Sequence, residues 1–225
     1  MRSFLKLASL VFIAATYCGS LHASSIIAYN DPANQGTQSW TGNLGLTFNV
    51  NSQIDVTSLG VFNAAGNGTI TGTINVVIYN NSGVAVTPVE SFHGTYTTSG
   101  FGYDVFQSIT PILLNPGSYE VDAVGFSSTD LNGNTTTGSS SGPTLNTGGG
   151  LLTFTGATYD SSTTLNDPTG CSGCLTAPSP QNQQFDAGTF TYVPVTSPVP
   201  EPSSFLLLGT GMAGIVGMMR RKLMS

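Results

Sequence analysis

The stretch that decides the fold class is Leu44-Gly45-Leu46-Thr47-Phe48-Asn49-Val50. Its apolar side chains stand at every second position, so in an extended chain they all point to the same face. This strict alternation predicts a β-strand that buries one face against a core and leaves the other face polar.

Short β-branched and aromatic runs recur through the middle of the chain, separated by turn-forming residues. Between Ser24 and Tyr192 no run has a convincing helical period. Strands are expected at 25–29, 44–50, 56–62, 69–79, 89–97, 103–109, 118–126, 151–154 and 185–193. Their spacing of about ten to fifteen residues predicts an all-β domain over residues 24–193, a β-sandwich of jelly-roll type.

Two polar stretches, 127–150 and 160–184, interrupt this series. The first is built from Ser, Thr, Gly and Asn with almost no apolar residue, which makes it too polar to bury. Both stretches are therefore predicted to be long surface loops.

The placement of charge is the sharpest feature of the composition. All five basic residues of the 225-residue chain lie within seven residues of one end or the other. Between Ser24 and Val199 there is no Lys or Arg, whereas ten of the eleven acidic residues fall there, which gives this stretch a formal charge of -10. Such a surface repels phosphate backbones and has no cation with which to hold them, so we expect no binding of nucleic acid.

Residues 1–23 are typical of a helical signal peptide. A basic start precedes the apolar run 7–16, and small residues then offer a cleavage position after Ala23. The alternatives are a lipid-modified Cys18 and a buried N-terminal helix. A signal peptide predicts that the domain is exported.

The C-terminal end has three parts in order. A Pro- and Val-rich linker over 194–204 contains Val199-Pro200-Glu201-Pro202, an uncharged run covers 205–219, and a basic end over 220–225 opens with Arg220-Arg221-Lys222. The sequences of these three parts and their order resemble the PEP-CTERM sorting signal of Gram-negative bacteria that make extracellular polysaccharide. The same kind of tail is sometimes labelled an ice-binding protein C-terminal domain, which describes the tail and not an ice-binding activity.

The physical properties of the tail agree with a single transmembrane helix over 205–219. Its fifteen residues would span about 22 Å as a helix, short of the roughly 30 Å hydrocarbon core, and Ser203, Ser204 and snorkelling basic side chains would close the gap. Both chain ends carry cations, so the positive-inside rule places residues 220–225 at the cytoplasmic face and the middle of the chain outside.

The resemblance implies a partner and a fate. Tails of this family are processed by an exosortase, a multi-pass membrane cysteine peptidase, so the chain would be a substrate of that enzyme. Cleavage near Pro200-Glu201-Pro202 would free the domain or transfer it to another acceptor. The implied location is a transient anchor in the inner membrane, followed by the cell envelope or the exterior.

A second resemblance lies in the middle of the chain. Its pieces are Leu46-Thr47-Phe48-Asn49-Val50, Ile54–Phe62 and Leu114-Asn115-Pro116-Gly117-Ser118-Tyr119. They resemble the recurring pattern of an uncharacterised β-sandwich module found beside PEP-CTERM tails. This resemblance agrees with the all-β prediction and implies no activity.

Cys171-Ser172-Gly173-Cys174 is the one conspicuous cysteine motif. In an exported protein, Cys171 and Cys174 are expected to form a disulfide that staples their loop. The alternative is a zinc site, in which Cys171 and Cys174 would be two of the four ligands. The chain offers no second pair, since His93 is the only histidine after residue 23. A redox motif is a further alternative, but prolines follow Cys174 where such motifs have a helix.

No arrangement of residues for catalysis stands out. The chain has no G-x-S-x-G motif that would supply a nucleophilic serine for His93. His93 is therefore interpreted as a partly exposed strand residue. Glu120 and Asp122 lie on one face of an expected strand, about 7 Å apart by strand rise. They fit either the paired carboxylates of a glycoside hydrolase or a solvated edge. We therefore expect no enzyme activity.

Two sets of oxygen-bearing residues are candidates for weak structural calcium. Asp130-Leu131-Asn132-Gly133-Asn134 offers oxygens at the first, third and fifth positions of a calcium loop, but the loop's later Gly and Glu are missing. Asn30, Asp31 and Asp186, near the two ends of the domain, form the second set. No other cofactor and no other metal is expected.

Trp40 is the only tryptophan and lies in the polar stretch 35–43. Aromatic platforms beside amide side chains bind sugars, so Trp40 is a candidate sugar contact. The alternative is a buried tryptophan that closes one end of the sandwich.

Three functions compete for the exported middle. The first is a non-catalytic cell-envelope or extracellular-matrix protein with some affinity for extracellular polysaccharide. The second is a secreted hydrolase acting on polysaccharide, and the third is an adhesin. The lack of Lys and Arg and the single His favour the first.

Overall fold

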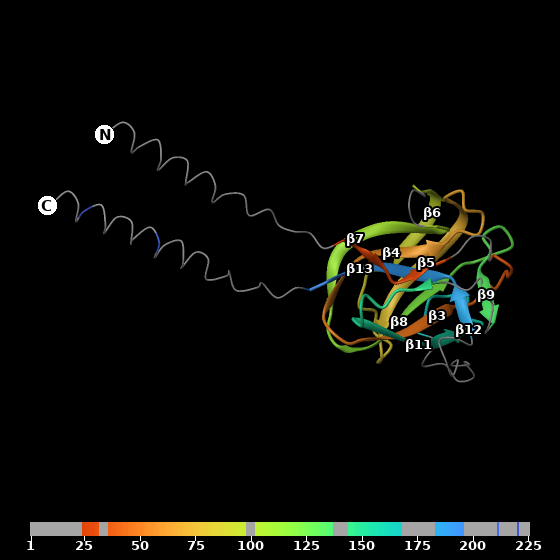
Figure 1. Ribbon diagram of the computed structural model, residues 1–225. Coiled ribbons are helices and arrows are strands. Elements are labelled where there is room, and N and C mark those ends of the chain that lie inside the picture. Colours follow the sequence, from red (N-terminus) through yellow and green to blue (C-terminus); the bar gives the residue numbers. More distant parts are fainter. Residues whose placement is uncertain are drawn as a thin grey trace, which may run out of the picture. The chain divides into compact units, whose positions relative to one another are not determined.

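The computed structural model describes residues 24–31, 36–97, 102–136, 144–167 and 183–195, together with Gly211 and Arg220 (Figure 1). The chain divides into two compact units, Met1–Pro194 and Val195–Ser225. Within the described part of residues 24–195 there are strands, turns and bends but no helix. The prediction of an all-β domain is therefore confirmed.

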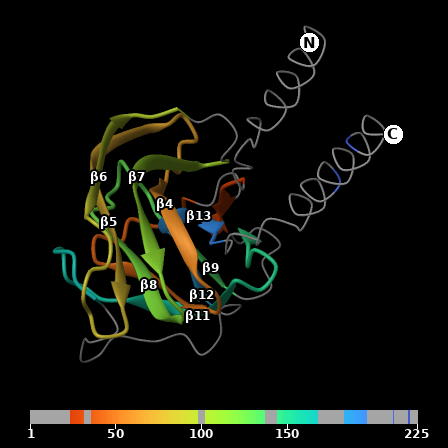
Figure 2. The same ribbon diagram turned by 90° about the vertical axis from the view of Figure 1, so that its left-hand side faces the viewer.

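The strands form two main antiparallel sheets (Figures 1 and 2). The four-stranded sheet has the order β1 (Ile26–Ile27), β13 (Gly188–Pro194), β4 (Ile54–Phe62), β7 (Asp104–Leu114). The five-stranded sheet has the order β11 (Leu152–Tyr159), β3 (Leu44–Val50), β8 (Gly117–Val124), β5 (Thr69–Asn80), β6 (Glu90–Thr95). With β11 and the short strands outside these sheets set aside, the chain changes sheet at every connection except β5 to β6. This is the strand order of a jelly roll.

Two short strand pairs complete the described fold. β2 (Tyr29–Asn30) pairs with β10 (Thr144–Leu145), and β9 (Gly133–Thr136) pairs with β12 (Gln183–Asp186). Each pair joins segments that lie more than 45 residues apart in the chain.

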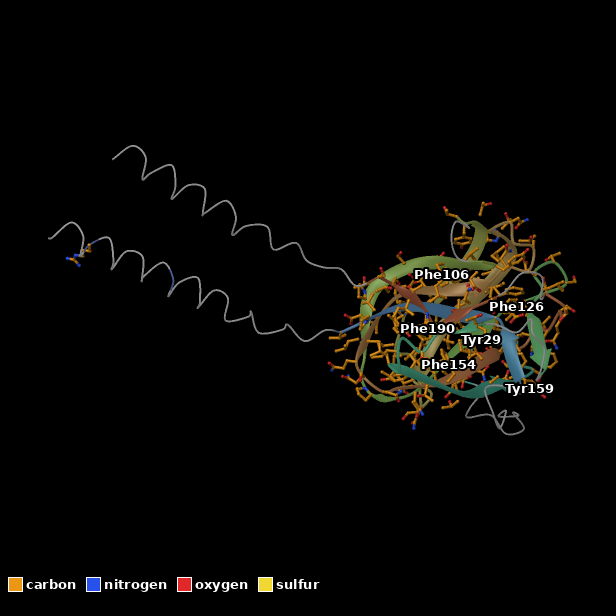
Figure 3. All side chains as sticks on the ribbon, viewed as in Figure 1. Tyr29, Phe106, Phe126, Phe154, Tyr159 and Phe190 are labelled. Atoms are coloured by element: carbon orange, nitrogen blue, oxygen red, sulfur yellow. The ribbon has the colours of Figure 1, made fainter. Side chains whose placement is uncertain are left out.

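The core lies between the two main sheets. The apolar residues of β3 predicted to share a face, Leu44, Leu46, Phe48 and Val50, are all buried. Phe48 meets Phe190 of the opposite sheet with ring centroids 4.9 Å apart, so these rings join the two layers. Tyr29, Phe154 and Phe190, which Figure 3 labels, belong to this core.

The prediction that residues 127–150 form only a surface loop is wrong, because β9 and β10 lie within that stretch. Asn132 has no exposed surface and Asp130 is 7 % exposed. Their burial is tolerated because each finds partners. Asp130 accepts hydrogen bonds from the backbone N–H groups of Thr71 and Gly72 at 2.8 and 2.7 Å. Polar composition alone therefore did not indicate exposure.

Several expectations concern residues outside the described ones. The signal peptide over 1–23 and all of 205–219 except Gly211 are among them. Among the residues that the structure describes, no helix is long and apolar enough to cross a membrane.

Phe48→Ala is expected to destabilise the domain by about 3–5 kcal/mol, because it removes a fully buried ring from the contact between the sheets. Guanidinium unfolding of the full-length chain in detergent measures the change. Leu113→Ala is the matched control, since Leu113 is 48 % exposed, and should cost no more than about 0.5 kcal/mol. Equal losses for the two variants would contradict the assigned core.

Candidate functional site

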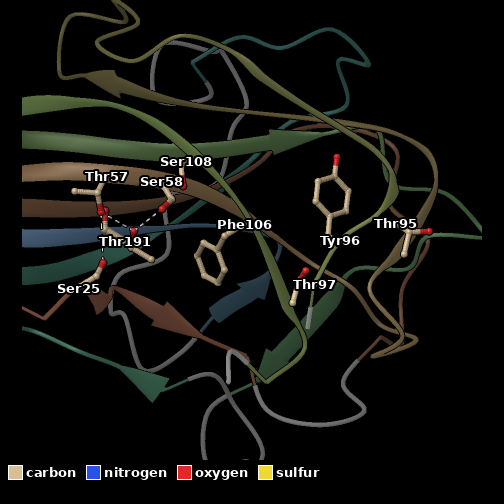
Figure 4. A pocket seen from close by; sticks show the side chains of 9 residues that line it. All are labelled: Ser25, Thr57, Ser58, Thr95, Tyr96, Thr97, Phe106, Ser108 and Thr191. Atoms are coloured by element: carbon tan, nitrogen blue, oxygen red, sulfur yellow. Dashed lines mark hydrogen bonds between the residues drawn. The ribbon is translucent and has the colours of Figure 1, made fainter. Parts of the chain in front are cut away.

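A depression with a volume of about 610 Å³ lies against β4, β7 and β13 (Figure 4). Of its nine lining residues, Phe106 is the only one without a hydroxyl group. The others are Ser25, Thr57, Ser58, Thr95, Tyr96, Thr97, Ser108 and Thr191. The lining carries no charge.

A β-bulge gathers several of these hydroxyls. The register between β4 and both its neighbours shifts next to Thr57, so Thr57 and Ser58 are not on strictly opposite faces. Both contact the hydroxyl of Thr191, which lies 2.8 Å from the Thr57 hydroxyl and donates to the Ser58 hydroxyl at 2.8 Å. The bulge thus produces a compact group of hydroxyls on the four-stranded sheet.

Phe106 lies between this group and the hydroxyls of Thr95, Tyr96 and Thr97 (Figure 4). A Cβ at Gly60 would collide with the Phe106 ring, so the glycine allows the ring to lie close over β4. The depression therefore combines one aromatic surface with hydroxyls on both sides.

His93 does not belong to a catalytic arrangement in the described residues. Its Nδ1 lies 2.7 Å from the carbonyl oxygen of Gly72 and donates to it. Its backbone N–H donates to the Tyr96 hydroxyl at 2.9 Å. His93 is an exposed residue of β6, as the sequence indicated.

Trp40 is half buried, and its indole N–H donates to the carbonyl oxygen of Asp160 at 3.1 Å. Its ring meets Tyr159 edge-on, with centroids 5.8 Å apart. The polar atom of the indole is therefore engaged within the protein. These contacts favour the alternative that Trp40 closes one end of the sandwich.

The loop after β11 wraps around the amide of Asn43. The Asn43 Nδ2 atom lies within 3.0 Å of four oxygens, which belong to Asp160, Ser162, Thr164 and Asn166. An amide nitrogen has two protons, so it can donate to only two of the four at a time. Asn43 itself has no exposed surface and anchors this loop over the outer face of the five-stranded sheet.

Glu120 and Asp122 lie on that outer face, but they are not a solvated edge. Glu120 is 2 % exposed and Asp122 is fully buried. A side chain at Gly45 would collide with Glu120, so the glycine leaves room for the carboxyl group, which accepts a hydrogen bond from the Thr158 hydroxyl. Burial raises the pKa of Glu120 to about 8, and burial and then Glu120 raise the pKa of Asp122 well above its usual value.

A second acidic cluster consists of Asp31, Asp104 and Asp186, none of which has any exposed surface. The backbone N–H of Asp31 donates to Asp104 Oδ2 at 2.9 Å. Asp31 lies close enough to both other carboxyl groups to hydrogen-bond with them when a proton is present. Burial raises the pKa of Asp104 to about 7 and that of Asp186 to about 6. For Asp31, burial and the two neighbouring carboxylates raise the pKa well above its usual value.

The sequence predicted that Asp31 and Asp186 come together, and the structure confirms it. It gave no sign of Asp104, which opens a strand in a different part of the chain. The other predicted calcium loop has its acidic residue engaged by backbone amides, since Asp130 binds Thr71 and Gly72.

Most of the predicted sorting and disulfide residues lie outside the described residues. These are Cys171, Cys174, Val199, Pro200, Glu201, Pro202, Arg221 and Lys222. Arg220 is described and exposed.

The comparison with family models assigns the C-terminal segment. Residues 198–222 match the model of the PEP-CTERM protein-sorting motif. The chain carries a PEP-CTERM protein-sorting motif at its C-terminal end. The motif implies an exported protein that is targeted to an exosortase, a membrane protein, and that is anchored in the membrane transiently before processing. The label of an ice-binding C-terminal domain has no support beside this match.

No curated protein and no solved structure matches the chain. The function of its sandwich must therefore be argued from the residues themselves.

Glu120→Gln is expected to make the stability of the domain less dependent on pH. Because the folded state raises the pKa of Glu120 from 4.5 to about 8, the wild type holds its proton more tightly when folded. Its stability should therefore fall as the pH rises through that window. Gln keeps an acceptor for Thr158 and carries no charge, so the variant should match the wild type near pH 4.5 and melt at a higher temperature at pH 8.5.

Thermal unfolding by circular dichroism between pH 4 and pH 9 measures this difference. Asp55→Asn, which removes a carboxylate from β4 away from Glu120, is the control and should leave the slope of the wild type unchanged. Parallel curves for Glu120→Gln and the wild type would show that the Glu120 carboxyl is not buried as described.

Proposed function

We propose that this chain is a non-catalytic protein of the cell envelope or extracellular matrix, and that its sandwich binds neutral polysaccharide weakly. The observation that carries the proposal is the hydroxyl-lined depression around Phe106. The sorting motif supports it, because the motif implies delivery out of the cell.

The chemistry of the depression suits a neutral sugar. Sugar hydroxyls both donate and accept hydrogen bonds, and so do the hydroxyls of Ser, Thr and Tyr. The C–H face of a pyranose packs on an aromatic ring, a role for which Phe106 is placed between two groups of hydroxyls. With only two aromatic rings in the lining, those of Phe106 and Tyr96, and no charged group, the affinity for a single sugar unit is expected to be low. Useful binding would come from repeated contacts along a polymer.

The charge of the domain selects among polysaccharides. Residues 24–199 carry ten acidic residues and no Lys or Arg. Uronic-acid or sulfated chains would find no Lys or Arg on this domain to pair with their charges. Neutral chains need no such partner, so we propose a neutral glycan as the ligand class.

The carboxylate pair does not favour the alternative of a hydrolase. A glycoside hydrolase needs two carboxyl groups that face a bound sugar. Glu120 and Asp122 are buried beneath the loop after β11, and neither lines the depression. An adhesin remains the second candidate, and it would contact protein surfaces instead of a free glycan.

Removal of the aromatic surface tests the glycan proposal. The Phe106→Ala variant is expected to lose about tenfold or more in affinity for a soluble neutral glucan, because the contact with the sugar face is lost. Affinity electrophoresis of the full-length chain in gels that contain a soluble neutral glucan measures the change.

Ser52→Ala is the matched control, because Ser52 is exposed and lies outside the depression. It should bind as the wild type does. Equal retardation of wild type and Phe106→Ala, or stronger retardation in gels with alginate than with neutral glucan, would contradict the proposal. Hydrolysis of the glucan would support the hydrolase instead.

The sorting part of the proposal has its own test. Replacement of Arg220, Arg221 and Lys222 by Gln should block processing, because these cations are expected to hold the end of the tail at the cytoplasmic face. Immunoblots of cell and medium fractions should then show the unprocessed chain retained in the cells. Unchanged processing would count against a role for the basic end, and Ser225→Ala is the control.

A further inference from the structure

The cluster of Asp31, Asp104 and Asp186 presents an unusual number of unpartnered oxygens. Of the six carboxylate oxygens, only Asp104 Oδ2 receives a hydrogen bond; while the three groups are ionised, the other five have no donor. Burial of a carboxylate is costly unless a cation, a proton or hydrogen-bond donors compensate for the lost water. The sequence supplies no Lys or Arg between Ser24 and Val199. A cation that compensates the ionised cluster would therefore come from outside the chain.

Tyr29 provides a second, independent observation. Its side chain has no exposed surface, and its hydroxyl has no hydrogen-bond partner. The charges of Asp31, Asp186 and Asp104 all act on this hydroxyl, which places it beside the cluster. A buried hydroxyl normally finds a partner, and a ligand held by the cluster would give the Tyr29 hydroxyl the partner that the chain does not supply.

The backbone leaves space around the same carboxylates. A Cβ at Gly133 would collide with the carboxyl group of Asp186. A Cβ at Gly102 would lie 2.9 Å from the carbonyl oxygen of Asp31 and 3.2 Å from the side-chain oxygen of Asn30. That Asn30 oxygen also has no hydrogen-bond partner. Carboxylates, an amide oxygen and a backbone carbonyl are therefore concentrated in one region, with no nitrogen or sulfur ligand among them.

We infer that Asp31, Asp104 and Asp186 bind a calcium ion, with Asn30 and the Asp31 carbonyl oxygen as further candidate ligands. Calcium takes six to eight oxygen ligands in flexible geometry, and this chemistry matches an all-oxygen set better than zinc or copper would. The ion would neutralise the carboxylates and connect the segments after β2, at the start of β7 and at the end of β12. It would thereby fasten the N-terminal strand to the rest of the sandwich.

The carboxylates are not arranged as ligands at present. Among the described residues, no group of three His, Cys, Asp or Glu side chains is placed, as it stands, to hold a metal ion. Binding would require the carboxylates to rotate toward a common centre. Five of the six oxygens have no bond to break during such a rotation, so the rearrangement is confined to side chains.

Direct binding is the first test. The full-length chain in detergent is stripped with EDTA, dialysed and titrated with Tb³⁺, whose luminescence is sensitised by a nearby tyrosine such as Tyr29. We expect saturable luminescence that calcium displaces and that Asp104→Asn weakens at least tenfold. Asp55→Asn, which removes a carboxylate outside the cluster, should bind as the wild type does.

Calcium should also raise the melting temperature of the wild type by about 5 °C or more at saturating concentration, because it binds only the folded state. Asp104→Asn should fold without calcium, since Asn keeps the acceptor for the Asp31 amide and removes a buried charge. Its melting temperature should not respond to calcium. If the variant fails to fold, calcium uptake by the wild type in equilibrium dialysis decides the matter.

Two outcomes would overturn the inference. One is a wild type that binds no calcium in dialysis and melts at the same temperature with calcium and with EDTA. The other is an Asp104→Asn variant that folds and retains the full terbium signal and calcium response, because the ion would then sit elsewhere.

Discussion

The constraint on which this structure depends is the absence of Lys and Arg from the exported domain. Between Ser24 and Val199 there is no Lys or Arg to pair with a carboxylate, so each buried carboxyl group needs another means of neutralisation. Asp130 uses the backbone amides of Thr71 and Gly72. Glu120 retains a proton to higher pH, beside the Thr158 hydroxyl. The cluster of Asp31, Asp104 and Asp186 receives only one hydrogen bond from a backbone amide. A metal ion is therefore proposed to neutralise it.

The same composition shapes the surface. With charge confined to acidic groups, the polarity of the four-stranded sheet comes from Ser and Thr, and the bulge at Thr57 concentrates their hydroxyls beside Phe106. A neutral, hydroxyl-rich depression on an acidic domain suits a neutral polymer outside the cell. The sorting motif at residues 198–222 accounts for delivery there, and it does so independently of what the sandwich binds.

The sequence pattern within short segments predicted the strands and the sorting tail. The alternation in residues 44–50 specified a strand and its buried face, and the Pro-Glu-Pro tail specified the sorting motif. Contacts between segments that lie far apart in the chain were not predicted. β9 has a short, polar sequence, and only its pairing with β12, half of which lies in the predicted strand 185–193, makes it a strand. Asp104 joins Asp31 and Asp186 through the folded topology, and no spacing in the sequence indicates that. The hydroxyl-lined depression likewise depends on a register shift that periodicity does not reveal.

The central claim is that the sandwich reaches the exterior and is separated from its sorting tail, and the intact mass of the mature protein tests it most directly. Mass spectrometry of the protein from cell envelope and medium should give a chain that begins near Ser24 and ends near Pro200. A mass that still includes residues 205–225 in both fractions would contradict exosortase processing and make the tail a permanent anchor.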